Sequence, residues 1–227
     1  MQVVQFRYFG RFGLFMRPET GTSWLTYPVP PRTALLGLLG AILGLPKDTP
    51  QQEWNNALIA VSGRAPVTHW HRAQVRKDPG KGKVIEQPKL QEQEWLLNPE
   101  YIVTVHLPGD WQEQLSLRLR EERLHFTPCM GLSEMLARVE WLGEYEAVSL
   151  PKSLHSVCSV SLESQGALDA EQAMEQGLAL QWVRMPRDVT EDRVFHQASY
   201  ILEREGRPLP LLTEHAWQVG DDVLMFL

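Results

Sequence analysis

The sequence predicts an α+β protein, with a mixed domain over residues 1–148 and a smaller β-rich part over residues 149–227. Three observations support this class. An alternating strand pattern near the N-terminus precedes an apolar helix, two long strand patterns flank a basic segment, and an amphipathic helix follows them. Strands mixed with a few helices in this way are typical of α+β folds.

The first elements are a strand, a loop and a helix. Residues 3–9 alternate apolar and polar side chains, as half-buried strands do. Residues 10–21 carry glycine and proline at intervals, which predicts a loop. Residues 31–44 follow a proline-rich segment and place leucine and isoleucine at helical spacing, so a helix is expected there. A short second helix is predicted for residues 51–60.

A long β-hairpin is predicted next, within about residues 64–107. Residues 67–77 and 91–107 have strand patterns, and a segment rich in glycine, proline and lysine lies between them. An amphipathic helix over residues 111–123 and a closing strand that begins within residues 131–143 complete a βαββαβ order. This order is that of the ferredoxin-like or RRM-type arrangement.

The C-terminal part has weaker signals. A helix is predicted over residues 167–178, and strands over residues 181–187, 194–203 and 217–226. No internal repeat and no low-complexity linker separates this part from the first.

The predicted helix at residues 31–44 begins with two unusual features. Arg32 lies in the first turn, where the helix dipole disfavours a cation. Gly37, Gly40 and Gly44 each lower helix stability by roughly 1 kcal/mol relative to alanine. Free amide groups at a helix start favour phosphate, and glycine permits close approach of a backbone or ligand. The segment predicts either a phosphate site or an ordinary buried helix with a solvated arginine.

Charge is distributed unevenly along the chain. Residues 1–90 contain 12 Lys and Arg against 5 Asp and Glu, whereas residues 91–227 contain 10 against 23, which together give the net charge of −6. This asymmetry indicates a basic surface for a polyanion and an acidic remainder.

The composition excludes several other classes. Cys129 and Cys158 have no spacing typical of a disulfide framework or a zinc site. The N-terminus lacks the pattern of a signal peptide, and the apolar run over residues 34–45 is shorter than the ~20 residues that span a membrane. We expect a cytoplasmic protein with no membrane contact, no cofactor and no metal.

His69, Trp70 and His71 form the most informative pattern of the hairpin. The two histidines share one strand face, with Trp70 on the other. A metal site would need further ligands, which the neighbouring sequence does not supply. Aromatic and histidine side chains beside Arg72 and Arg76 suit base stacking with phosphate contact. The alternative is an amphipathic strand with a solvated face.

Lysines follow at the tip of the predicted hairpin, at Lys77, Lys81 and Lys83. Such charges suit contact with a nucleic-acid backbone, and a solvated turn is the alternative. The spacing is not that of a phosphate-binding Walker loop.

No motif of a known catalytic class is present. Metal-free RNA cleavage needs a base, an orienting group and a cation, and Tyr27, His71 and Lys77 are candidates for these roles. Many basic RNA-binding surfaces offer the same residue types.

The longest specific motif lies at the helix start, Thr26-Tyr-Pro-Val-Pro-Pro-Arg-Thr-Ala-Leu-Leu-Gly-Leu-Leu-Gly-Ala-Ile-Leu-Gly44, preceded by Arg17-Pro-Glu-Thr. Together with Asn98-Pro-Glu-Tyr-Ile-Val103 and Gly131-Leu-Ser-Glu-Met135, it resembles the CRISPR-associated protein five family. These RAMP-type subunits hold the 5′ handle of the guide RNA (crRNA) in Cascade-type complexes. The resemblance covers roughly residues 1–145.

The resemblance implies an RRM-like domain with a thumb-like hairpin, and contacts with the backbone subunit and the large subunit. Through the complex, target DNA would be an indirect partner. One branch of the family cleaves precursor guide RNA with a tyrosine, a lysine and a histidine, but this chain lacks the Lys-His dipeptide associated with that branch. The residues expected to contact RNA are Arg11, Arg17, Thr22, Ser23, Tyr27, Arg32, Thr33, His69, His71, Arg72, Arg76, Lys77, Lys81 and Lys83.

We therefore expect a non-catalytic RNA-binding subunit of a type I CRISPR complex. Two alternatives stay open: a metal-independent endoribonuclease that uses Tyr27, His71 and Lys77, and an RRM-like protein-interaction module without salt-dependent RNA affinity.

Overall fold

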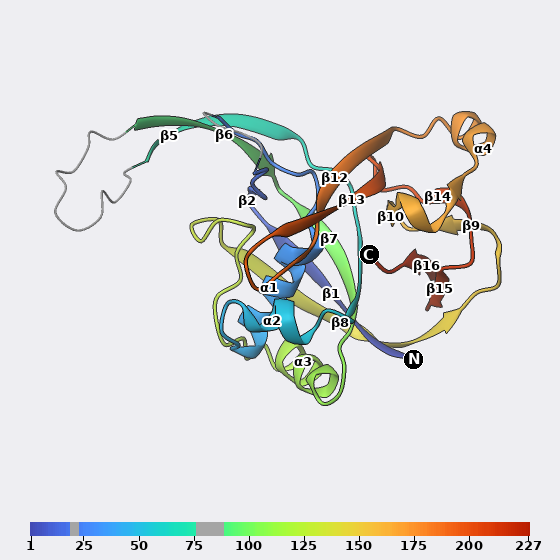
Figure 1. Ribbon diagram of the computed structural model, residues 1–227, viewed down its shortest axis with the longest axis horizontal. Coiled ribbons are helices and arrows are strands. Elements are labelled where there is room, and N and C mark those ends of the chain that lie inside the picture. The colour runs from blue at the N-terminus through green and yellow to red at the C-terminus, as the bar shows by residue number, and fades with distance from the viewer. Residues whose placement is uncertain (19–22, 76–88) are drawn as a thin grey trace.

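The computed structural model describes residues 1–18, 23–75 and 89–227. The α+β class is confirmed, since helices and strands alternate in the first part and strands dominate the second (Figure 1). Among the described helices, none is long and apolar enough to cross a membrane.

A six-stranded sheet forms the centre of the molecule, in the order β16-β15-β8-β1-β7-β4 and with every pair antiparallel. Its strands are β1 (Gln2–Gly10), β4 (Leu58–Ser62), β7 (Glu100–His106), β8 (Ala137–Ser149), β15 (Ala216–Val219) and β16 (Asp222–Met225). With the helices α1 (Arg32–Leu43) and α3 (Trp111–Arg120), four of these strands follow the predicted βαββαβ order: β1, α1, β4, β7, α3, β8.

The helix α1 matches its prediction closely. Pro31 precedes the first helical residue, and Gly44 ends the helix in the left-handed conformation (φ 83°), which glycine adopts without strain. Leu35, Leu39 and Ile42 are fully buried against the sheet. The apolar periodicity therefore identified the buried face correctly.

The close approach expected at the glycines of α1 is found at Gly40 and not at Gly37. A Cβ on Gly40 would lie 2.3 Å from Cγ of Pro50, so Gly40 admits the neighbouring helix α2 (Thr49–Glu53). A Cβ on Gly37 meets nothing within 4 Å. The predicted helix over residues 51–60 is wrong beyond residue 53, because residues 58–62 pair with β7 as the buried strand β4.

The hairpin consists of β5 (Thr68–Val75) and β6 (Lys89–Leu97), paired antiparallel from Thr68 opposite Leu96 to Val75 opposite Lys89. It extends away from the body of the molecule (Figure 1). At its base, β6 also pairs with β2 (Phe12–Gly13) and β3 (Ser23–Trp24). The predicted strand over residues 91–107 is two strands, because the chain turns at Asn98 (φ 47°) and β7 returns to the central sheet.

The C-terminal part adds two three-stranded sheets, β10-β13-β12 and β11-β14-β9. Its elements are β9 (Ser153–Val157), β10 (Val160–Leu162), the 3₁₀ helix η1 (Glu163–Gln165), β11 (Ala167–Leu168), α4 (Ala170–Glu175), β12 (Leu180–Val189), β13 (Phe195–Glu203) and β14 (Leu209–Thr213). The predicted strands over residues 181–187 and 194–203 are confirmed as β12 and β13. The predicted strand over residues 217–226 is instead the hairpin β15–β16, which turns at Gly220 (φ 57°) and joins the central sheet.

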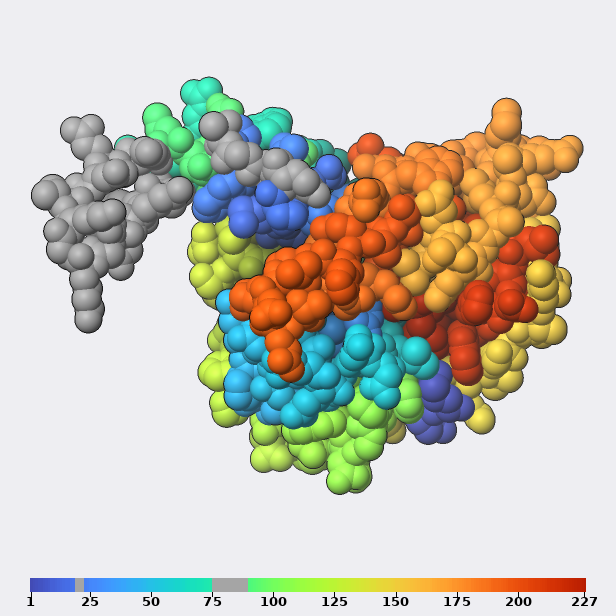
Figure 2. Space-filling view, viewed as in Figure 1, coloured from blue at the N-terminus to red at the C-terminus, as the bar shows by residue number. Residues whose placement is uncertain are grey.

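One hydrophobic core joins the two parts of the chain. Val183, Met185 and Tyr200 from β12 and β13 belong to the same buried cluster as Leu35 of α1 and Val103 of β7. In the space-filling view the β12–β13 segment, in orange, lies across the N-terminal residues in blue and cyan (Figure 2). The predicted boundary after residue 148 falls at the end of β8, and packing continues across it.

Candidate nucleic-acid interface

An aromatic ladder, formed by Phe12, Trp95 and His71, lies on one face of the hairpin. The ring centroids of Phe12 and Trp95 are 5.2 Å apart, and those of Trp95 and His71 are 4.0 Å apart at an interplanar angle of 30°. The guanidinium carbon of Arg11 lies 5.2 Å from the centroid of the Phe12 ring. All three rings are partly exposed, and Arg11 is exposed. The ladder thus combines π faces with a cation.

The strand register explains why these rings meet. His71 lies directly opposite Gln93, and Trp95 is two residues further along β6, so the two rings are diagonal neighbours on the same face. The indole Nε1 of Trp95 donates a hydrogen bond to Oε1 of Gln93 at 2.8 Å, which fixes the ring. Phe12 joins them because β2 pairs with β6.

The opposite face of the hairpin carries Trp70 and Arg72, as the predicted alternation requires. Trp70 is 54% exposed. Arg72 is exposed but forms an ion pair with Glu92 across the strands, with 3.1 Å between Nη2 and Oε1. The positive charge predicted for this strand is therefore partly balanced by β6. His69 is exposed and lies directly opposite Trp95 in the register.

Tyr27 is buried, with 2% of its surface exposed, and its ring belongs to the main core. The prediction that Tyr27 faces a ligand does not match this burial. Its amide donates to the carbonyl of Phe15 at 2.9 Å, which turns the ring inward. Arg17 covers the ring, with its guanidinium carbon 5.3 Å from the centroid, and its Nε donates to the Thr26 carbonyl at 2.9 Å.

Arg32 is also buried, at 4% exposed, and the expected anion at its side chain is replaced by carbonyl groups of the protein. Its guanidinium donates to the carbonyls of Asn55 and Ala57 at 3.0 and 2.8 Å. Longer contacts reach the carbonyls of Trp54 at 3.5 Å and Arg187 at 3.3 Å. Burial lowers the pKa of Arg32 below its ordinary value, and the charge of Arg187 lowers it further. These contacts give Arg32 a structural role at the end of α2. They argue against the phosphate site that was one of the two predictions for this helix start.

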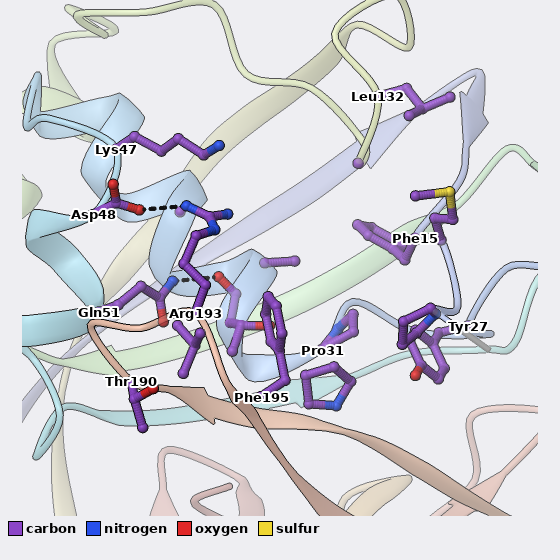
Figure 3. A pocket seen from close by; sticks show the side chains of 18 of the residues that line it. Phe15, Tyr27, Pro31, Lys47, Asp48, Gln51, Leu132, Thr190, Arg193 and Phe195 are labelled. Carbon is purple, nitrogen blue, oxygen red and sulfur yellow. Dashed lines mark hydrogen bonds and ion pairs between the residues drawn. The ribbon is translucent and has the colours of Figure 1, made fainter.

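Thr33 lines a groove of about 530 Å³ between α1 and the turn that joins β12 to β13. Figure 3 shows Phe15, Pro31 and Phe195 along its walls. An ion pair between Arg193 and Asp48 (3.0 Å) lies at one end. The walls are mainly apolar, so we do not assign this groove to the surface that contacts RNA. Ser23 lies elsewhere, in β3 beside β6, and is half-buried.

Five of the residues expected to contact RNA lie outside the described residues, namely Thr22, Arg76, Lys77, Lys81 and Lys83. The three residues of the alternative catalytic set are not found together in the described structure. Tyr27 is in the core, His71 stacks on Trp95, and Lys77 lies outside the described residues. Within the described ranges, no group of three or more His, Cys, Asp or Glu is arranged to hold a metal ion.

Phe12 and Trp95 were missed by the sequence reasoning. Trp95 lies in a segment that was correctly predicted as a strand, whereas Phe12 lies in the predicted loop over residues 10–21 and is found in the strand β2. The contact of Trp95 with His71 depends on the register between β5 and β6, and that with Phe12 on the pairing of β2 with β6, which both follow only from the tertiary structure.

Comparison with known proteins identifies the family. A model of the family described as CRISPR-associated protein (Cas_Cas5) matches residues 3–199. The chain belongs to this CRISPR-associated protein family. The match confirms the family that the sequence motifs predicted. A search of curated protein sequences found no match.

Solved structures with a fold similar to this family member include two with high coverage. One is a chain of a "CRISPR RNA-guided surveillance complex", with a TM-score of 0.54, 14% identity and 91% of both chains covered. The other is a CRISPR protein from Archaeoglobus fulgidus, with a TM-score of 0.53, 13% identity and 98% of both chains covered. At these identities the likeness concerns the fold.

Proposed function

We propose that this protein is a non-catalytic, RNA-binding subunit of a type I CRISPR effector complex, and that it holds the 5′ handle of the crRNA. Its partners would be the backbone subunit and the large subunit, with target DNA reached indirectly. The family match and the likeness to a chain of an RNA-guided surveillance complex support this class. The order β8-β1-β7-β4 is the strand order expected of an RRM-type unit.

The aromatic ladder is the observation that carries the RNA-binding part of the proposal. Single-stranded nucleic acid is bound by aromatic faces on which bases stack, together with cations that follow the backbone. Phe12, Trp95 and His71 supply such faces, and Arg11 and Arg17 supply charge on the adjoining segment. The ladder lies on a hairpin that extends from the body, where an extended RNA strand has access from the solvent (Figure 1).

A titration with labelled crRNA-repeat RNA tests the proposal. We expect binding to weaken with salt, and Trp95→Ala to weaken it about tenfold, because one base stack contributes about 1–3 kcal/mol. Trp217→Ala is a matched control, since Trp217 is also partly buried against an aromatic ring (Phe226, centroids 5.8 Å apart) but lies in β15. Equal affinities of the wild type and Trp95→Ala contradict the proposed site.

The same RNA, incubated in EDTA, tests the alternative enzyme. The proposal predicts intact RNA after incubation with the wild type. A discrete cut that disappears in His71→Ala would establish the endoribonuclease instead. Absence of any salt-dependent RNA affinity would favour the protein-interaction module.

A further inference from the structure

A second aromatic and cationic site lies beside the base of the hairpin, in the C-terminal part of the chain. Here the strand β12 and the residues Arg17 and Leu25 border a cleft of about 340 Å³. Trp182 and Arg184 contribute to its wall from β12. Trp182 is 52% exposed, although a ring of this size is normally buried, and Arg184 is exposed as well.

The local geometry of β12 holds both side chains at the surface. Val183 and Met185 are buried in the main core, so strand alternation turns Trp182 and Arg184 to the opposite side. β12 is the outer strand of the sheet β10-β13-β12, with β13 on one side only. The indole ring therefore rests on a rigid strand whose other edge borders the cleft.

Charge distinguishes this cleft from three other cavities of the described residues. The groove beside α1 contains both signs, with Asp48 and Arg193 paired at 3.0 Å. The cavity beside Gln5 has Asp221 and Asp222 and no cation among the described residues that line it, and the cavity beside Lys152 also contains Glu214. Among the described residues that line it, the cleft at Trp182 has two arginines and no carboxylate.

We infer that this cleft binds one nucleotide of a single-stranded RNA, with the base stacked on Trp182 and the phosphate beside Arg184 and Arg17. The inference rests on the proposed RNA-binding function and extends it to the C-terminal part. An exposed indole offers a face on which any base stacks, and arginines supply the charge that a phosphodiester requires. Arg17 follows Arg11 and Phe12 on the same segment of the chain, so arginine side chains lie both at the aromatic ladder and at the cleft.

The experiment uses the full chain and fluorescein-labelled oligoadenylate, followed by fluorescence anisotropy. Trp182→Ala is expected to weaken binding about tenfold, whereas Trp182→Phe keeps most of the affinity because the ring is retained. Arg184→Gln is expected to reduce the slope of log affinity against log salt by about 0.7. Trp217→Ala and Arg118→Gln, in β15 and α3, are the matched controls and should bind as the wild type does.

A labelled strand of the same length without bases shows whether Trp182→Ala acts through lost base stacking or through a change in the protein structure. The inference predicts that Trp182→Ala leaves affinity for this abasic strand unchanged. Equal loss on both strands overturns the stacking role, and wild-type affinity of both Trp182→Ala and Arg184→Gln overturns the site. If those variants bind normally while Trp95→Ala does not, this inference fails and the proposed function stands. If the wild type binds no RNA, both fail.

Discussion

Replacement of Arg32 by methionine should destabilise the protein strongly and leave the RNA-binding surface in place. Methionine keeps the apolar stem but removes the donors that reach the carbonyls of Asn55 and Ala57 at 3.0 and 2.8 Å. A hydrogen bond to a charged group contributes about 1.5–3 kcal/mol, so the two shorter bonds together contribute about 3–6 kcal/mol. For a chain of this size, each 1 kcal/mol lowers Tm by roughly 2–4 °C, so Tm should fall by about 6–24 °C.

Thermal and urea unfolding, followed by circular dichroism, measure this effect. Arg11→Met is the control, because the Arg11 side chain is exposed and its replacement should change stability by less than about 0.5 kcal/mol. An Arg32→Met protein with the Tm of the wild type and a loss of RNA affinity would refute the structural role of Arg32. That result would support instead the hypothesis of a phosphate site at Arg32.

Three further changes test other parts of the fold by the same unfolding measurements. Gly37→Ala should stabilise the protein by roughly 0.5–1 kcal/mol, because an added Cβ meets nothing within 4 Å on this helix; a lower Tm would contradict it. Gly131→Ala should destabilise it by more than about 1 kcal/mol, because φ is +89° and the Cβ would lie 1.9 Å from the Leu14 carbonyl oxygen; an unchanged Tm would show that the loop relaxes. Glu203→Gln should lower Tm near pH 7 and less so near pH 3. Burial alone would raise the pKa of Glu203, but hydrogen bonds from the Ala179 amide and from Arg207 outweigh it and lower the pKa below the ordinary 4.5. The ionised carboxylate therefore stabilises the fold above about pH 4.5, and this contribution is lost as the pH falls through the lower folded-state pKa; an equal Tm difference at both pH values would contradict this.

Elements with strong local signals were predicted well. α1 begins and ends within a residue of its prediction, because Pro31 and Gly44 mark its ends and the leucines mark its buried face. The strand at residues 3–9, the hairpin and the helix that begins at Trp111 were found for the same reason. The family motifs covered the same N-terminal region.

Predictions failed where long-range contacts decide the outcome. Residues 58–62 have apolar side chains that suit either a helix or a buried strand, and pairing with β7 selects the strand. The turn at Asn98 divides what looked like one strand, because β7 is needed in the central sheet between β1 and β4. The strands β9, β10 and β14 were not predicted at all, since they are short and lack clear alternation.

The sequence by itself determined the order of strands and helices in the first part, the basic character of residues 1–90, and the family. Local periodicity and turn residues carry this information, because they act over a few residues. Only the tertiary structure decided which charged and aromatic side chains reach the surface. Arg32 is buried because α1 packs beside the end of α2, and Trp95 meets His71 because of one strand register. Trp182 is exposed because its neighbours in β12, Val183 and Met185, occupy the face that packs into the main core. Such contacts join residues far apart in the chain, which local patterns do not specify.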